Sequence, residues 1–177
     1  MARSLTQRMI GAAMLDVSVY EEVEHDLNAT GQAAAVVAIV AVCAAIGASG
    51  AGIRGIIGAV INAFIMWVLW SFLTWFIGTK LFHGTATVSE LLRTLGFAMA
   101  PGVLYLLGII PILGGLIGIV VWIWTLVAGV IAIRQALDFD TTKAVLTAVI
   151  SWIVVIVVSI VLAGLIAGAS ALGGLLG

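Results

Sequence analysis

The sequence predicts an all-α, polytopic integral membrane protein: a helical bundle of about five transmembrane helices, preceded by short N-terminal helices. Two observations support this fold class. The 177 residues are 64% hydrophobic and only 8% charged, whereas a typical soluble domain is roughly 25% charged. Long stretches carry no charge at all, and a membrane-spanning helix needs about 20 such apolar residues. So few charges cannot cover a surface that faces water, and we expect the chain to lie in a lipid bilayer.

The charged residues mark the ends of the predicted spans. The forty uncharged residues between Arg93 and Arg134 would form a helix about 60 Å long, which is twice the roughly 30 Å hydrocarbon core. We therefore expect a helical hairpin there, with its turn at Pro111, Gly114 and Gly115, and a kink at Pro101. The glycine-rich end of the chain is expected to fray or to fold back on the bundle. The five predicted spans lie near residues 33–52, 56–77, 91–110, 112–133 and 144–165.

The distribution of charge predicts the orientation and the domains. If the N-terminus is cytoplasmic, six of the seven basic residues fall on cytoplasmic segments and only Arg54 lies outside. Such a bias in short loops is the positive-inside pattern. We expect a multi-pass protein of the cell membrane whose C-terminus lies outside. Residues 1–30 would form cytoplasmic amphipathic and acidic helices, and residues 31–177 the transmembrane domain.

Short capping signals predict where several helices begin. Ser4 with Gln7, Ser18 with Glu21, and Thr87 with Glu90 each fit a capping box. Asp140 is the predicted N-cap of the last span. The first of these helices either lies on the membrane surface or packs under the bundle, and the sequence favours neither.

The acidic segment 16–26 is either a solvated face or a docking element for basic loops or a basic protein partner. We predict that it docks on the chain's own basic loops through the burial of Tyr20 and Val23. The available basic residues would be Lys80, Arg93, Arg134 and Lys143. Glu90 and Arg93 also lie three residues apart, so they can pair on one helical turn. The candidate interaction face comprises Tyr20, Glu21, Glu24, Lys80, Glu90, Arg93, Arg134 and Asp138.

The predicted spans contain polar residues but no deeply placed ionisable group. Hydrogen bonds between helices are the common use of such residues, and a cavity is the alternative. Five tryptophans are expected to fill the bundle core more often than to line a cavity: Trp67, Trp70, Trp122, Trp124 and Trp152. The candidate intramembrane polar or cavity residues are Asn62, Thr74, Pro101, Tyr105 and Thr125.

The sequence argues against several classes of function. No catalytic residues are expected, because neither a catalytic triad nor paired intramembrane carboxylates can be recognised. His83 has no partner at metal-ligand spacing and Cys43 is the only cysteine, so we expect no metal and no cofactor. No basic patch predicts nucleic-acid binding. The expected partners are membrane lipids, a cytoplasmic protein, and a second copy of the chain, packed through the pairs Gly114/Gly118 and Gly164/Gly168.

Three segments resemble one membrane protein family. The run FIGTKLFHGTATVSELLRTLGFAMAP, residues 76–101, is similar to the central signature of the Yip-domain family, the Ypt/Rab-GTPase-interacting proteins. The connection IAIRQALDFDTTKA, residues 131–144, and the acidic VYEEVEHD, residues 19–26, are also similar to family segments. The chain resembles the compact prokaryotic type, without the long N-terminal region and the Asp-Leu-Tyr-Gly-Pro motif of eukaryotic members. The resemblance implies five transmembrane helices, a cytosolic N-terminus and a role like trafficking or membrane shaping.

These observations predict a non-enzymatic membrane protein that organises partner proteins or lipids through its cytoplasmic face. The concentration of both charge signs on that face motivates this prediction. The alternative is a small transporter, channel or lipid-translocating protein whose pathway is lined by Asn62, Thr74, Tyr105 and Thr125. A continuous polar groove would favour the alternative.

Overall fold

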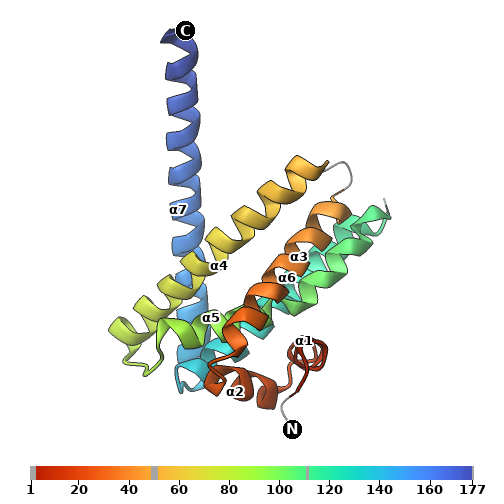
Figure 1. Ribbon diagram of the computed structural model, residues 1–177. Coiled ribbons are helices and arrows are strands. Elements are labelled where there is room, and N and C mark those ends of the chain that lie inside the picture. Colours follow the sequence, from red (N-terminus) through yellow and green to blue (C-terminus); the bar gives the residue numbers. More distant parts are fainter. Residues whose placement is uncertain (1–2, 49–51, 111, 177) are drawn as a thin grey trace.

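The computed structural model describes residues 3–48, 52–110 and 112–176. Every element within those ranges is a helix (Figure 1), as the composition predicted. Seven are α-helices, and the third predicted span continues as a 3₁₀ helix, η1. The elements are α1 (Leu5–Ala13), α2 (Val17–His25), α3 (Ala29–Gly47), α4 (Ile53–Phe82), α5 (Val88–Ala98), η1 (Ala100–Ile109), α6 (Gly114–Ala136) and α7 (Thr141–Leu176).

Five helical segments are long and apolar enough to cross a membrane, which confirms the predicted fold class. The segment that corresponds to span three combines α5 and η1. The five segments are Ala29–Gly47, Ile53–Phe82, Val88–Ile109, Gly114–Ala136 and Thr141–Val161.

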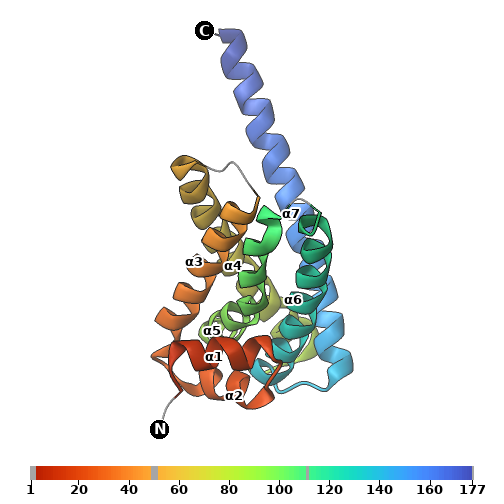
Figure 2. The ribbon, with the colours of Figure 1, turned by 90° about the vertical axis from the view of Figure 1, so that its right-hand side faces the viewer.

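The two short helices α1 and α2 lie across one end of the bundle (Figure 2). We call this the N-terminal end; it also holds the turns at 83–87 and 137–140. From there α3, η1 and α6 run together toward the opposite end, while α4 and α7 pack against each other (Figure 1). The second half of α7 extends beyond the other helices in both views.

The length of α7 corrects the prediction for the end of the chain. Span five was expected to end near residue 165, with the remainder frayed or folded back. Instead α7 is one helix from Thr141 to Leu176. The residues between its glycines are mainly alanine, leucine and isoleucine. A continuous helix satisfies their backbone groups internally, which lipid demands and a frayed chain would not achieve.

Span three changes its helix type beside Pro101. The α-helix α5 ends at Ala98 and η1 begins at Ala100, with Pro101 in its first turn. Proline has no N–H for the helical ladder, so the α-helix cannot continue through it unchanged. The N–H of Gly102 instead reaches the carbonyl of Met99 at 2.8 Å. The predicted kink is therefore a change to a tighter helix.

Close backbone contact between α3 and η1 depends on one glycine. A Cβ atom on Gly47 would overlap the carbonyl oxygen of Tyr105. Only glycine lets the two backbones approach this closely without displacing one of them. This contact sets the position of Tyr105 at the far end of the bundle.

The hairpin between spans three and four has the predicted location but a different turn. The N–H groups of Leu113 and Gly114 both donate to the carbonyl of Ile110, at 3.0 and 3.1 Å. Gly114 and Gly115 are the first residues of α6 rather than turn residues. Pro111 lies outside the described residues.

The helix starts agree with the capping signals in three of four cases. The capping boxes of Ser4 with Gln7 and of Thr87 with Glu90 are both formed. The carboxylate of Asp140 accepts the N–H of Lys143 at 3.0 Å, as an N-cap does. The box predicted at Ser18 is wrong, because α2 begins two residues earlier than that box implies, and Asp16 caps it by accepting from the N–H of Ser18.

Candidate functional site

A buried arginine on α1 fastens the two N-terminal helices together. Arg8 is only 1% exposed. Its guanidinium donates to Glu22 and to Asp26 of α2, each at 2.7 Å, and to the amide oxygen of Gln32 on α3 at 2.9 Å. Because all its partners come from other helices, Arg8 connects α1, α2 and α3. A buried charge requires such pairing.

The ionisation of this cluster follows from its geometry. Burial opposes the charge of Arg8, but the hydrogen bonds to Glu22 and Asp26 raise the pKa of the guanidinium above its ordinary value. Burial alone would also raise the pKa of Glu22, yet the bonds from Arg8 and Arg3 lower it. The bond from Arg8 lowers the pKa of Asp26. The cluster is therefore fully ionised at neutral pH.

A second buried arginine holds the C-terminal end of α2. Arg93 of α5, also 1% exposed, donates to the carbonyl oxygens of Val23 and Glu24 and to the hydroxyl of Ser89. Cations at a helix C-terminus are stabilised by its unpaired carbonyls and by the helix dipole. The side chain of Arg93 therefore holds α2 by the backbone carbonyl oxygens of that helix. The expected pairing of Arg93 with Glu90 is wrong, because Glu90 accepts from the backbone N–H of Thr87.

The acidic helix is docked, but by partners other than those predicted. Tyr20 and Val23 are buried, and the Tyr20 hydroxyl donates to the carbonyl of Ala12 at 2.9 Å. Glu22 and Asp26 pair with Arg8 of α1, and Glu22 also pairs with Arg3, which precedes that helix. The predicted pairing with Lys80, Arg134 and Lys143 is therefore wrong across the described ranges. The N-terminal arginines are nearer to α2 than the loops are, because α1 folds back on it.

Four acidic residues that do not pair with Arg3 or Arg8, together with His25, lie on the outer side of the N-terminal end. Glu21, His25 and Asp138 are exposed, while Glu24 and Glu90 are half-buried. Burial, followed by the neighbouring carboxylates of Asp138, Glu90 and Glu21, raises the pKa of Glu24 to about 7. Asp138 accepts from the hydroxyl of Thr85 at 3.0 Å. We call Glu21, Glu24, His25, Glu90 and Asp138 the acidic face.

The other predicted interaction residues lie elsewhere on the N-terminal end. Lys80 is exposed in the last turn of α4. Arg134 is half-buried and donates to the side chain of its neighbour Gln135. Neither forms an ion pair with another described residue.

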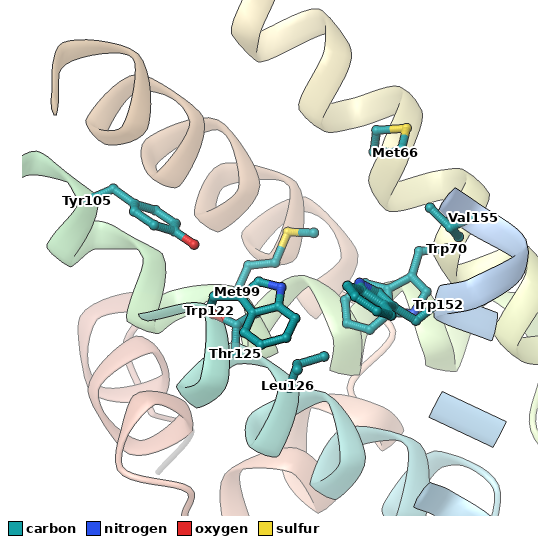
Figure 3. A pocket seen from close by; sticks show the side chains of 9 residues that line it. All are labelled: Met66, Trp70, Met99, Tyr105, Trp122, Thr125, Leu126, Trp152 and Val155. Carbon is teal, nitrogen blue, oxygen red and sulfur yellow. The ribbon is translucent and has the colours of Figure 1, made fainter. Parts of the chain in front are cut away.

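Three adjacent cavities meet at Tyr105. The first, which we call the aromatic cavity, has a volume of about 200 Å³ and lies between α4, η1, α6 and α7 (Figure 3). The second, of about 370 Å³, lies between α3, α4, η1 and α6, and includes Asn62. The third, of about 460 Å³, lies at the far end beside Gly47. Tyr105 lines all three, and Thr125 lines the first two.

The structure separates two of the candidate cavity residues from the other three. Thr74 of α4 is fully buried and lines none of the three cavities. Pro101 lines a different cavity, of about 280 Å³, between α1, η1 and Trp124 of α6. Thr74 therefore lies outside the three cavities that Asn62, Tyr105 and Thr125 help to line.

Several buried polar groups on α4 and α7 lack hydrogen-bond partners. The hydroxyls of Ser71 and Thr74 on α4 and of Thr147 and Ser151 on α7 are buried without one. So is the indole N–H of Trp70. Buried polar groups are normally paired, so these side chains differ from the paired polar groups at the N-terminal end.

Sequence reasoning missed several residues that build these sites. Arg8 entered the sequence analysis only as one of the basic residues that predict the orientation. The available signal was an arginine four residues after the N-cap Ser4, followed closely by an acidic helix. Three of the five tryptophans expected to fill the core, Trp70, Trp122 and Trp152, line the aromatic cavity instead. Their convergence needs three helices in register, which no local pattern specifies.

Two further expectations concern contacts between copies and metal binding. A Cβ atom on Gly118 or Gly164 would meet no atom within 4 Å, so neither glycine packs against another helix of this chain. Within the ranges that the structure describes, no three His, Cys, Asp or Glu residues form a group that could hold a metal ion.

One family matches the chain over most of its length. The model of the Yip1 domain family matches residues 18–163. The match begins in α2 and ends in α7, so it includes the Arg93 contact and the three cavities. No curated protein and no solved structure matches the chain.

Proposed function

Because the chain belongs to the Yip1 domain family of membrane proteins, we propose that it is a non-enzymatic, multi-pass protein of the cell membrane that organises partner proteins or lipids at the cytoplasmic face. One observation supports this most directly. The buried residues Arg8 and Arg93 hold α1 and α2 rigidly against the bundle. We call α1, α2 and the acidic face the platform. A rigid, charged surface of this kind is suited to recognition, because little conformational entropy is lost on binding.

The distribution of basic residues supports a cytoplasmic N-terminal end. Arg54 lies in the first turn of α4 at the far end. The other basic residues lie in or just before α1, in α5, and near the 83–87 and 137–140 turns. This is the positive-inside pattern on the folded chain. In a variant without Cys43, an impermeant thiol reagent should reach a cysteine at Gly84 only from the cytoplasm. Labelling of that cysteine from outside would contradict the orientation.

The two kinds of partner would use different parts of the platform. The acidic face fits a protein with a basic surface, since complementary charges steer association. It does not fit the anionic lipids of a cytoplasmic leaflet. We expect α1 to contact the lipid instead, because Ile10 and the C-cap residue Met14 are 56% and 74% exposed. An exposed apolar side of this kind, on a helix lying across the bundle end, is typical of interfacial helices.

A charge-reversal pair tests the protein partner. Glu21→Lys changes an exposed residue of the acidic face, and Arg54→Glu changes an exposed residue at the opposite end. The full chain would be cross-linked in its native membrane, purified, and its bound proteins identified. We expect Glu21→Lys to lose a basic partner that Arg54→Glu retains. Equal recovery from both variants would contradict recognition through the acidic face.

The meeting of three cavities at Tyr105 favours a second candidate, lipid translocation. Their walls are mainly apolar and the polar residues are discontinuous, so this geometry supports the platform better. Transfer of a fluorescent phospholipid between the leaflets of proteoliposomes tests it. Dithionite-accessible signal above that of protein-free vesicles would favour translocation, and Tyr105→Trp should then reduce the rate.

A further inference from the structure

Three polar side chains of the membrane-spanning part line one cavity without a hydrogen-bond partner. They are Asn62, Tyr105 and Thr125, and we call this cavity, of about 370 Å³, the Asn62 cavity. None of the three side chains forms a hydrogen bond with another described residue, and none of them is fully buried. In this they differ from the hydroxyls of Ser71 and Thr74, which are enclosed by protein. A molecule in the cavity can therefore reach their polar atoms.

Asn62 places an amide inside the membrane-spanning part of α4. It lies eight residues after Arg54, or about 12 Å further along the helix axis, which is less than half of the roughly 30 Å hydrocarbon core. The amide offers two N–H donors and an acceptor oxygen, and hydrocarbon tails can satisfy neither. Because Asn62 lines the cavity and is also exposed, the cavity is open to the lipid beside α4. A ligand can therefore enter from the membrane.

An apolar groove follows Asn62 along α4 and gives the ligand a direction. Its lining residues are Phe64, Ile65, Val68, Leu69 and Phe72. Ile65 and Leu69 come three and seven residues after Asn62, so they lie on the same side of the helix. The groove covers the middle of α4, whereas Asn62 is closer to the Arg54 end. A polar group nearer the membrane surface and an apolar chain nearer its centre is the arrangement of an amphiphilic lipid.

The walls of the Asn62 cavity disfavour a charged head group. The remaining lining residues are alanine, valine, methionine and glycine, so a phosphate or an ammonium group would be buried without a counter-charge. The amide and the two hydroxyls can each donate and accept a hydrogen bond. Figure 3 shows the hydroxyl of Tyr105 directed toward Met99, another residue of this cavity. A small, neutral head with a hydroxyl group and ester oxygens matches this set.

We propose that the Asn62 cavity binds the head of a neutral diacyl lipid with a free hydroxyl, as in a diacylglycerol. One acyl chain lies in the apolar groove, and the other lies in the surrounding lipid. The lipid hydroxyl accepts from the N–H of the Asn62 amide and donates to an oxygen of the cavity. The ester carbonyls accept from Tyr105 or Thr125. This site is separate from the proposed platform, because it uses none of the platform's residues.

Photo-cross-linking of the full chain in phosphatidylcholine nanodiscs tests the site. The probe is a diacylglycerol with a photoreactive group in one acyl chain, and unlabelled lipids compete with it. The competitors are diacylglycerol, its methyl ether and phosphatidic acid, all with the same chains. We expect saturable labelling, with the ether and phosphatidic acid about tenfold weaker as competitors, because one lacks the hydroxyl donor and the other is charged. Equal competition by the three lipids, or labelling that does not saturate, would overturn the proposal.

A matched set of variants assigns the labelling to the cavity. Asn62→Leu removes the amide at an exposed position, so we expect it to fold normally, with about tenfold lower affinity. It should also lose most of the preference for diacylglycerol over the methyl ether, which a structural role of Asn62 would not predict. Tyr105→Phe removes only a hydroxyl and should lower the affinity about threefold.

Thr74→Val is the control for these variants. It also removes a hydroxyl from α4, but Thr74 lines none of the three cavities that meet at Tyr105. We expect its affinity for the probe to be unchanged. Equal affinities in Asn62→Leu and Thr74→Val would overturn the assignment.

A contact between two copies is the competing explanation for an exposed amide on a membrane-spanning helix, since amides pair across helices. Sedimentation of the unmodified chain and of Asn62→Leu in detergent decides between the two. We expect the same oligomeric state in both. A dimer that becomes a monomer in Asn62→Leu, with lipid labelling unchanged, would overturn the lipid site. Absence of a basic partner for the acidic face would contradict the proposed platform and leave this site unaffected.

Discussion

Buried polar groups are paired in one region of this molecule and unpaired in another. Around α1, α2 and α5, the side chains of Arg8, Arg93 and Tyr20 each reach carboxylate or carbonyl oxygens of another element. On α4 and α7, four hydroxyls are buried without partners. Both regions contain buried polar atoms, but only the first uses them to fix its helices in place. Satisfied networks specify one arrangement, whereas unsatisfied groups leave neighbouring arrangements close in energy.

This difference shows which helices are fixed in position by paired polar groups and which are not. The N-terminal end is fastened by charges that cannot be moved without leaving another charge buried. On α4 and α7 the four unpaired hydroxyls add no such constraint. We therefore place recognition by a rigid surface at the first region.

Removing the arginine at the centre of the paired region should have the largest effect. Arg8→Met leaves Asp26 without its partner and Glu22 with only Arg3. Breaking a buried ion pair costs about 3 to 5 kcal/mol, and we expect the lower value because Arg3 remains. Thermal unfolding in detergent measures the loss. The control Arg3→Met affects a more exposed pair and should cost at most about 1 kcal/mol. Equal costs would mean that burial of Arg8 contributes nothing.

Filling a close backbone contact should have the next largest effect. Gly47→Ala places a Cβ against the carbonyl oxygen of Tyr105, and such overpacking costs about 1 to 3 kcal/mol. Gly58→Ala is the control, because a Cβ at that position in α4 meets no atom within 4 Å. It should be neutral or stabilising by up to about 1 kcal/mol. A neutral Gly47→Ala in the same unfolding assay would show that α3 and η1 are not in close contact.

Deleting an unpaired hydroxyl should stabilise the α4–α7 region. Thr147→Val replaces a fully buried, unpaired hydroxyl and should raise the free energy of unfolding by about 1 kcal/mol, because it removes an unsatisfied group. Thr94→Val is the opposite case, since Thr94 donates to the carbonyl of Glu90 at 3.0 Å. That variant should lose about 1 kcal/mol. A loss in both would show that Thr147 is paired, and the contrast between the regions would disappear.

The parts of this fold that were predictable depend on composition and short-range pattern. Absence of charge over about 20 residues is decided by the cost of burying ions in lipid, so the five spans could be located. Capping boxes involve residues three apart, and the two that formed were visible as Ser4 with Gln7 and Thr87 with Glu90. Asp16 was overlooked because Ser18 offered a competing signal two residues later.

The parts that were not predictable depend on contacts between distant segments. Arg8 pairs with α2 only because the chain reverses after α1, at Leu15, which adopts a left-handed conformation with φ of 63°. Leucine is not one of the residues that favour turns, so the sequence does not indicate a reversal there. The aromatic cavity likewise requires Trp70, Trp122 and Trp152 from three helices.

The smallest expected effect is a pH dependence of the docked α2 helix. Burial raises the pKa of Glu24 to about 7 from an ordinary 4.5, so the folded state binds its proton more tightly than the unfolded state. Stability from this group is therefore complete below about pH 4.5 and is lost as pH rises through 7. His25 has a raised pKa too, chiefly through the bond to the carbonyl of Glu21, and acts in the same direction above pH 6.5.

Hydrogen exchange of residues 17–25, corrected for intrinsic rates, separates the two groups. We expect greater protection of α2 at pH 6 than at pH 8 in the unmodified chain. Glu24→Gln should remove most of that difference, because the amide stays neutral, while His25→Gln should remove little, since His25 is exposed. The pairs of Arg8 with Glu22 and Asp26 do not change charge in this range, because the pKa of each carboxylate is lowered. Protection that rises with pH would contradict the burial of Glu24, and α2 would then be held by its arginines alone.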